Sequence, residues 1–279
     1  FTKLLDLYDA FVFDCDGVIY EGHKQISNSI ETLKTLQQMG KKIFFLTNAC
    51  MYPRTRAVAK FAKFGIKVGE KQVFTAAYLS AAYINNKHPE IKKVYVIGQE
   101  GVNHELNLFD IEAIGGQEHN DQTLGIEEDE ETIPDYDESI GAVLLGLDFK
   151  VSQYKLAYAT NLIKNGAKFF ATHGDITYVL KEEFYPAGGM FKALLECSTG
   201  EEGLILGKPN PYGIEMILKE NGCDADRTVM VGDRLEVDIK MGQDSGLDTM
   251  LVFTGATSKE MFEENLQKEG GIKPTFFAQ

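Results

Sequence analysis

The chain has 279 residues, a hydrophobic fraction of 44%, a formal net charge of −14 and a sequence pI near 4.9. This length and composition suit one large or two ordinary globular domains with a sizeable core. The negative charge argues against nucleic acid as a partner, because phosphate backbones bind basic patches, and no apolar run approaches the length of a membrane span. No signal peptide is visible at the amino terminus, so we expect a cytoplasmic protein.

The first informative segment is an apolar run, residues 10–13, that ends in Asp14-Cys15-Asp16-Gly17. Such a run is typical of a buried parallel strand, and open α/β sheets carry their sites at the carboxyl ends of strands. Side chains two residues apart in an extended segment point the same way, so Asp14 and Asp16 are expected to reach one crevice. Neighbouring carboxylates repel unless a cation or a shared proton relieves them, and Mg²⁺ meets that need. The alternative is an ordinary strand-end turn, in which Asp and Gly are common.

Helix and strand signals alternate after this segment. The patterns predict helices that begin at Asn28, where Glu follows three residues later as in a capping box, and at Pro53, and a third over residues 75–86. Between the first two helices lies a second apolar run, which ends in Thr47 and Asn48. The beginning of the chain therefore predicts an α/β domain.

The block of residues 79–183 has strand and helix signals of its own, at 93–98, 141–146, 155–164 and 168–171. A block of about a hundred residues is too long for a loop inside a compact domain. We therefore expect a second domain inserted in the first, with the core formed by residues 1–78 and 184–279. An acidic run at 127–138 lacks periodicity, which favours a solvated loop over a divalent-ion or partner site.

Polar clusters also follow two later apolar runs. The run 204–206 leads into Gly207-Lys208-Pro209-Asn210-Pro211, and the run 228–231 leads into Gly232 and Asp233, with Asp238 five residues further on. In a parallel sheet, strand ends of this kind meet at one edge. The carboxylates, hydroxyl, amide and ammonium of these clusters suit the binding of Mg²⁺ together with phosphate, and attack on phosphorus.

This order of motifs resembles the haloacid dehalogenase-like superfamily of phosphohydrolases, whose motifs are Asp-x-Asp-Gly, Thr, Lys and Gly-Asp-x-x-x-x-Asp. Here they read Asp14-Cys15-Asp16-Gly17, Thr47, Lys208 and Gly232-Asp233 with Asp238. The segments 16–20, 207–212 and 231–235 are similar to the para-nitrophenylphosphatase and phosphoglycolate phosphatase branch. The resemblance implies a Rossmann-like, doubly wound parallel-sheet core with an inserted α/β cap domain, and we expect a homodimer formed through that cap.

The resemblance also implies roles for the motif residues. Asp14 would be the nucleophile that forms an aspartyl phosphate, and Asp16 would be the general acid and base. Mg²⁺ would bind the Asp14 side chain, the Asp16 backbone carbonyl and Asp233, while Asp238 would orient water or Lys208 unless it is merely a solvent-facing helix residue. The phosphate would be bound by Gly17, Thr47, Asn48 and Lys208.

Substrate choice is expected to lie in the cap, where the branch carries a Thr-Asn-x-Asp segment that faces the core site. Here the segment reads Thr172-His173-Gly174-Asp175, which makes His173 and Asp175 candidate substrate contacts, with a structural role for the lone His173 as the alternative. After Thr47 and Asn48 the branch often has Asn-Ser, whereas this chain has Ala49-Cys50. We interpret Cys15 and Cys50 as small, reduced core residues in preference to oxidation-sensitive ones.

The predicted function is a Mg²⁺-dependent phosphomonoester hydrolase acting on a small phosphorylated metabolite, such as para-nitrophenyl phosphate or a phosphoglycolate-like compound. A phosphomutase is the first alternative, but mutases of this superfamily carry a small helical cap for which residues 21–42 leave little room. A non-catalytic phosphate-binding scaffold is the second, and it would have lost one of the catalytic residues, all of which are present. The residues do not distinguish phosphoglycolate from pyridoxal phosphate or glycerol phosphate as the physiological substrate.

Overall fold

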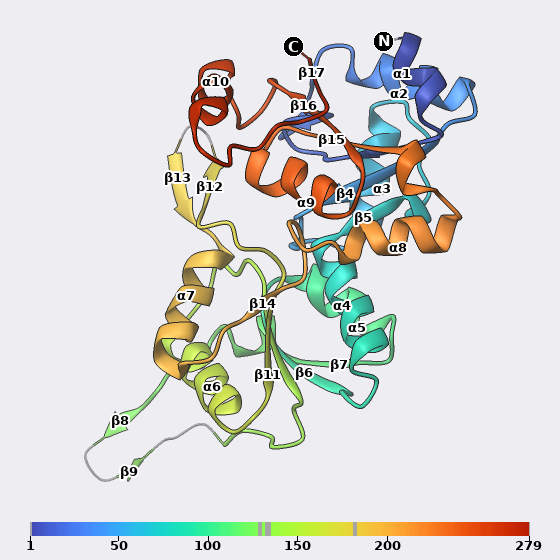
Figure 1. The fold of residues 1–279 in the computed structure, drawn as a ribbon. Coiled ribbons are helices and arrows are strands. Elements are labelled where there is room, and N and C mark those ends of the chain that lie inside the picture. Colours follow the sequence, from blue (N-terminus) through green and yellow to red (C-terminus); the bar gives the residue numbers. More distant parts are fainter. Residues whose placement is uncertain (1, 128–129, 132–134, 181–182, 279) are drawn as a thin grey trace. The chain divides into compact units, whose positions relative to one another are not determined.

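The structure is a computed structural model that describes residues 2–127, 130–131, 135–180 and 183–278. The chain divides into two compact units, the first formed by residues 1–47, 54–75 and 208–279 and the second by residues 48–53 and 76–207. Each unit contains its own parallel sheet flanked by helices (Figure 1). The predicted fold class, a doubly wound α/β core that is interrupted by a second α/β domain, is confirmed.

The sheet of the first unit has six parallel strands in the order β17-β16-β15-β1-β4-β5. These are β1 (Ala10–Phe13), β4 (Lys42–Thr47), β5 (Val73–Thr75), β15 (Thr228–Gly232), β16 (Asp248–Val252) and β17 (Phe276–Ala278). When the six strands of this sheet are numbered along the chain, their order from β5 to β17 is 3-2-1-4-5-6. The order reverses between β1 and β15. Ligands of such sheets bind beyond the carboxyl ends of the strands at this reversal. The residues that follow β1 and β15 are therefore in the position where a site is expected.

Helices cover this sheet because its central strands are apolar on both faces. All four residues of β1 are buried, and Phe11, Phe13 and Phe45 pack with side chains from the first three helices in one core cluster. The helices of the unit are α1 (Thr2–Leu7), α2 (Ser29–Gln38), α3 (Arg54–Lys63), α8 (Tyr212–Asn221), α9 (Lys240–Asp244) and α10 (Lys259–Gln267). Short helical turns at Glu70–Gln72, Ala225–Arg227 and Leu235–Ile239, and a hairpin of β2 (Tyr20–Glu21) and β3 (Lys24–Gln25), complete it.

The sheet of the second unit has five parallel strands in the order β14-β11-β10-β6-β7. These are β6 (Lys93–Ile97), β7 (Glu112–Gly115), β10 (Ala142–Leu145), β11 (Lys168–Ala171) and β14 (Leu204–Ile205). Figure 1 shows α4 and α5 on one side of this sheet and α6 and α7 on the other. Their bounds are α4 (Ala76–Lys87), α5 (Glu100–Asn107), α6 (Gln153–Lys164) and α7 (Gly188–Thr199). A helical turn at Gly116–His119 and the antiparallel pairs β8 (Ile126–Glu127)–β9 (Glu130–Glu131) and β12 (Thr177–Leu180)–β13 (Glu183–Pro186) complete the unit.

The second unit is longer than the inserted domain expected at residues 79–183. The chain leaves the first unit after Thr75 and returns at Lys208, so α7 and β14 belong to the second unit. The apolar run 204–206 was expected to be a core strand, but β14 pairs with β11 of the second sheet. A short apolar run predicts a buried strand without indicating which strand it pairs with, so local sequence carried no information on this point.

The start of the first predicted helix differs in one detail from the capping box expected at Asn28. Helix α2 begins near Asn28 as predicted, but Asn28 has a left-handed backbone (φ 62°) and makes no capping hydrogen bond with its side chain. The hydroxyl of Ser29 instead donates to the carbonyl of Ile26 at 2.8 Å.

Of the acidic run 127–138, residues 128–129 and 132–134 lie outside the described residues, and the described part includes β9. Within the described residues, no helix has both the length and the apolar character needed to cross a membrane.

Candidate active site

A buried ion-pair network lies at the carboxyl ends of β1 and β15. Asp14 directly follows β1, and its backbone N–H donates to the Val231 carbonyl of β15 at 2.9 Å, which extends the ladder to the residue that carries the carboxylate. The Lys208 Nζ donates to Asp14 Oδ1 at 2.5 Å and to Asp238 Oδ1 at 2.7 Å. The exposed fractions of Asp14, Lys208 and Asp238 are 6%, 4% and 0%. Lys208 thus joins two carboxylates that are far apart in the sequence.

Asp233 adds a third carboxylate to this network. It follows β15, and its Oδ2 accepts the N–H of Ala256 at 2.6 Å. Its Oδ1 is buried and has no hydrogen-bond partner among the described residues. Oxygen atoms of Asp14, Asp233 and Asp238 lie within 4.8 Å of one another. Three carboxylates beside one ammonium leave two negative charges uncompensated when all are ionised, and oxygen donors in this arrangement suit a hard divalent cation.

The electrostatic environment agrees with this reading. Burial raises the pKa of Asp14 well above its ordinary value, Asp238 and Asp233 raise it further, and Lys208 opposes them. Burial also raises the pKa of Asp233, against the hydrogen bond from Ala256. Burial alone would lower the pKa of Lys208, but Asp14 and Asp238 raise it above its ordinary value. The two carboxylates therefore favour the charged form of Lys208, and a further positive charge would stabilise the ionised carboxylates.

Glycines allow the backbone to approach Asp233 closely. Gly17 has φ +82°, and a Cβ at Gly17 or at Gly255 would overlap the Asp233 Oδ2 atom. The Thr254 hydroxyl donates to the Gly17 carbonyl at 2.6 Å, which ties the turn after β1 to the segment after β16. Sequence reasoning missed residues 254–256. The rule that polar and glycine residues gather at strand ends would have found them, because they closely follow β16.

The two aspartates of the first motif have different surroundings. Asp14 is buried, whereas Asp16 is exposed, and the Asp16 carboxylate is not a member of the cluster found among the described residues. The turn is closed by the backbone N–H groups of Ile19 and Tyr20, which donate to the Cys15 carbonyl at 2.8 and 3.1 Å. Cys15 itself is fully buried in the apolar core of the first unit. The turn thus leaves the Asp16 side chain accessible to water.

The residues after β4 are divided between the two units. Thr47 is the buried last residue of β4 and pairs in register with Thr75 of β5. Asn48 belongs to the second unit, where its Nδ2 donates to Asp175 Oδ2 at 3.4 Å. His173 follows β11, and its Nδ1 lies 3.3 Å from the backbone N of Asp175 and 3.4 Å from Asp175 Oδ2. The structure therefore brings Asn48 together with His173 and Asp175, which were predicted from a different segment of the sequence.

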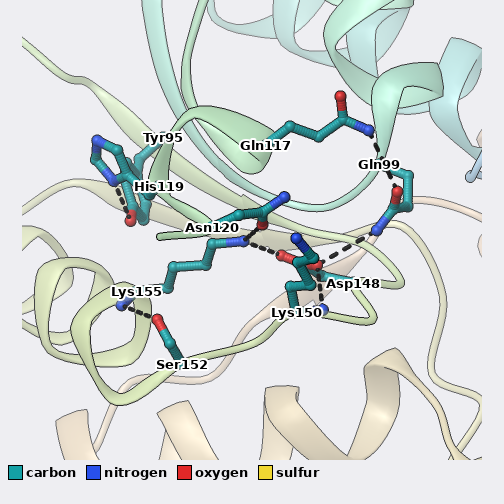
Figure 2. Close-up of polar contacts among 9 residues, drawn as sticks. All are labelled: Tyr95, Gln99, Gln117, His119, Asn120, Asp148, Lys150, Ser152 and Lys155. Carbon is teal, nitrogen blue, oxygen red and sulfur yellow. Dashed lines mark hydrogen bonds and ion pairs between the residues drawn. The ribbon is translucent and has the colours of Figure 1, made fainter. Parts of the chain in front are cut away.

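The second unit also contains a buried ion pair that sequence reasoning missed (Figure 2). The Lys155 Nζ donates to Asp148 Oδ2 at 2.6 Å and to Asn120 Oδ1 at 2.7 Å. The other oxygen of Asp148 accepts from Gln99 Nε2 at 3.3 Å and from the backbone N of Lys150 at 2.8 Å. Asp148 follows β10 and Gln99 follows β6, the strands between which the order of this sheet reverses. The pair links the loops at this reversal to α6.

Comparison with known proteins agrees with this geometry. The sequence matches the haloacid dehalogenase-like hydrolases over residues 11–112 and a HAD-hydrolase-like family over residues 205–279. It is 35% identical to phosphoglycolate phosphatase 2 of Arabidopsis thaliana over 99% of this chain and 92% of that protein. The chain belongs to the haloacid dehalogenase-like hydrolases.

Other relatives and solved structures of this family are also similar over nearly the whole chain. The 4-nitrophenylphosphatase of Schizosaccharomyces pombe is 34% identical over all of this chain and 94% of its own length. The p-nitrophenyl phosphatase from Archaeoglobus fulgidus superposes with a TM-score of 0.84, with 27% identity and coverage of 98% of this chain and 96% of that one. This haloacid dehalogenase-like protein is a phosphatase.

Proposed function

We propose that this phosphatase hydrolyses small phosphomonoesters in two steps, through a phosphoryl group carried on Asp14. The observation that supports the proposal best is the buried contact of Lys208 with both Asp14 and Asp238 beside the Asp233 carboxylate. A buried lysine that bridges two carboxylates would be costly to maintain for stability alone. At this strand end it supplies the charge that a transferring phosphoryl group needs.

Each residue has a distinct part in the proposed reaction. An Asp14 carboxylate oxygen attacks phosphorus and displaces the alcohol, which forms the aspartyl phosphate. The exposed Asp16 carboxyl protonates the departing alcohol and then takes a proton from the water that cleaves the aspartyl phosphate. Lys208 stabilises the charge on the phosphoryl oxygens, and Asp238 holds the Lys208 ammonium in place.

The carboxylate cluster fits a divalent cation, and we propose Mg²⁺ held by Asp14, Asp233 and the Asp16 carbonyl. When bound, this ion neutralises negative charge on the phosphate and on Asp14. Gly17, Thr47 and Asn48 are proposed to hydrogen-bond phosphate oxygens. The unpaired Oδ1 of Asp233 and the uncompensated charge of the cluster support the assignment.

The proposed substrates are para-nitrophenyl phosphate and phosphoglycolate-like metabolites, because relatives at 34% and 35% identity are a 4-nitrophenylphosphatase and a phosphoglycolate phosphatase. The first unit supplies the phosphate chemistry, and we propose that the second unit acts as a cap in which His173 and Asp175 read the leaving group. A homodimer assembled through this cap is part of the same proposal and is supported by the family resemblance. We also propose a cytoplasmic location, which the four free cysteines support.

Replacement of Asp14 by Asn tests the mechanism. We expect the turnover of both para-nitrophenyl phosphate and phosphoglycolate with Mg²⁺ to fall by several orders of magnitude, because the nucleophile is lost, while the far-ultraviolet circular dichroism is unchanged. Asp226→Asn is the matched control, since Asp226 is exposed on another turn of the same unit. Near wild-type turnover of Asp14→Asn would refute the proposed nucleophile.

A shared intermediate gives a second test. With a small alcohol added as a competing acceptor, every substrate should divide its phosphoryl group between water and the alcohol in the same ratio, because each passes through the same aspartyl phosphate. Ratios that differ between para-nitrophenyl phosphate and phosphoglycolate would argue for direct attack by water.

A further inference from the structure

Two of the three positions at which this chain departs from the pattern of its branch are in contact with each other. Cys50 stands where the branch often has Ser, and His173 stands where it has Asn. In the second unit, the Cys50 thiol and the His173 imidazole are hydrogen-bonded. Both side chains are buried, with exposed fractions of 3% and 6%. The two departures therefore form one buried pair.

The pair is part of a larger set of contacts between segment 48–50 and loop 172–175. The backbone N–H of Leu147 donates to the Cys50 sulfur at 3.4 Å. His173 also contacts Asp175, since its Nδ1 lies 3.3 Å from the backbone N of Asp175. The Asp175 carboxylate in turn accepts a hydrogen bond from Asn48 Nδ2 at 3.4 Å. Two side-chain contacts, Cys50 with His173 and Asn48 with Asp175, thus join the same two segments.

Two glycines border the pair. A Cβ at Gly188, the first residue of α7, would lie 3.2 Å from His173 Cε1 and 3.3 Å from His173 Nε2. A Cβ at Gly146 would lie 3.6 Å from the Cys50 sulfur. An added Cβ at Gly188 would therefore crowd the His173 ring, whereas one at Gly146 would lie at an ordinary contact distance from the Cys50 sulfur.

We propose that Cys50 is a positioning residue that holds the His173 imidazole and thereby sets the place of loop 172–175, which determines preference among leaving groups. The proposal rests on the proposed function in one respect, namely that this loop reads the leaving group. Asp175 is the group whose place depends on the pair, because its backbone N–H and its carboxylate both face the His173 ring.

The pKa of the Cys50 thiol is lowered, as expected for a thiol beside an imidazole. Burial by itself raises the pKa of Cys50, but the hydrogen bond to His173 and the charge of that ring outweigh it, so the pKa lies below the ordinary thiol value. The groups that face the thiol are the His173 ring, the Leu147 N–H and the Thr172 hydroxyl, and the Asp175 carboxylate lies beyond the ring. Removal of the imidazole should leave burial, which raises the thiol pKa, against the smaller effects of the Leu147 N–H and the Thr172 hydroxyl.

Titration of the thiol tests the pair without using activity. The ultraviolet absorbance of the Cys50 thiolate, taken as the difference between the wild type and Cys50→Ser, should rise with pH around a midpoint below the ordinary thiol value. In a His173→Asn background, with His173→Gln as a substitute if that variant does not fold, the midpoint should move up. Burial raises the pKa of Cys15 and Cys223, which lowers their contribution near neutral pH. An unchanged midpoint would overturn the proposal.

A double-mutant cycle tests the effect on preference. The readout is the ratio of kcat/KM for phosphoglycolate to that for para-nitrophenyl phosphate in Cys50→Ala, His173→Asn and the double variant. Each single change should shift the ratio about 3- to 30-fold, and the double change should shift it by no more than the larger single effect, because both remove the same contact. Cys197→Ser, an exposed thiol on α7, should leave the ratio unchanged.

Each result has a defined meaning. Multiplicative single effects, or no effect of Cys50→Ala on the ratio, would overturn the positioning role and leave the proposed hydrolysis through Asp14 intact. Conversely, an active Asp14→Asn variant would overturn the proposed function, while the shift in the Cys50 titration would still be observed.

Discussion

The buried ion pair of the second unit allows a quantitative prediction for Lys155→Met. The substitution keeps an unbranched side chain but removes the ammonium. Asp148, which is 4% exposed in the wild type, then loses the positive charge of Lys155. Asp148 Oδ1 keeps its hydrogen bonds from Gln99 and Lys150, whereas Oδ2 loses the Lys155 donor at 2.6 Å (Figure 2). Removal of one partner from a buried ion pair lowers the free energy of unfolding by about 3–5 kcal/mol. Because two hydrogen-bond donors to Asp148 remain, we expect a loss of about 3 kcal/mol, the low end of this range.

The free energy of unfolding should be measured by urea denaturation followed by circular dichroism, since the chain has no Trp. Lys164→Met, an exposed position on the same helix, is the matched control and should change stability by less than about 0.5 kcal/mol. Asp148→Asn combined with Lys155→Met leaves no buried charge at the site of this pair and should recover more than half of the loss. A Lys155→Met variant within about 1 kcal/mol of the wild type, or a double variant less stable than the single one, would refute this reasoning.

Three further predictions concern the first unit. Asp16→Asn should slow phosphorylation of the enzyme less for para-nitrophenyl phosphate than for an alkyl phosphate in single-turnover experiments, because a good leaving group needs less proton donation; equal losses would contradict the acid role. Activity should require Mg²⁺ and be inhibited by Ca²⁺, because Ca²⁺ accepts more ligands and can engage both oxygens of Asp14, and full activity in a chelator would disprove the requirement. Gly17→Ala should raise the Mg²⁺ concentration needed for half-maximal activity at least tenfold, since its Cβ would displace the Asp233 carboxylate. Gly40→Ala is the control, because Gly40 has φ +70° and an added Cβ would meet no atom within 4 Å, so this substitution introduces backbone strain without crowding. If both variants need the same Mg²⁺ concentration, crowding at Asp233 does not explain the effect of Gly17→Ala.

The amino-acid sequence by itself determined the type of most elements and the motif residues of the first unit. The apolar runs before Asp14 and Asp233 predicted β1 and β15, and the runs at 93–98, 141–146 and 168–171 predicted β6, β10 and β11. These predictions held because a buried parallel strand has a local signature, a short continuous apolar run, and because strand ends of one sheet share an edge.

Tertiary structure alone decided which strands are neighbours and which polar groups meet. β14 looked like a core strand from its apolar residues, yet it pairs with β11 of the second sheet. Lys208 contacts Asp14 across 194 positions of sequence, Cys50 contacts His173, and Lys155 pairs with Asp148 inside the second unit. Periodicity reports only how a segment alternates between core and solvent. A buried polar contact depends on the partner that the fold brings to it, so it leaves no signature in either segment alone.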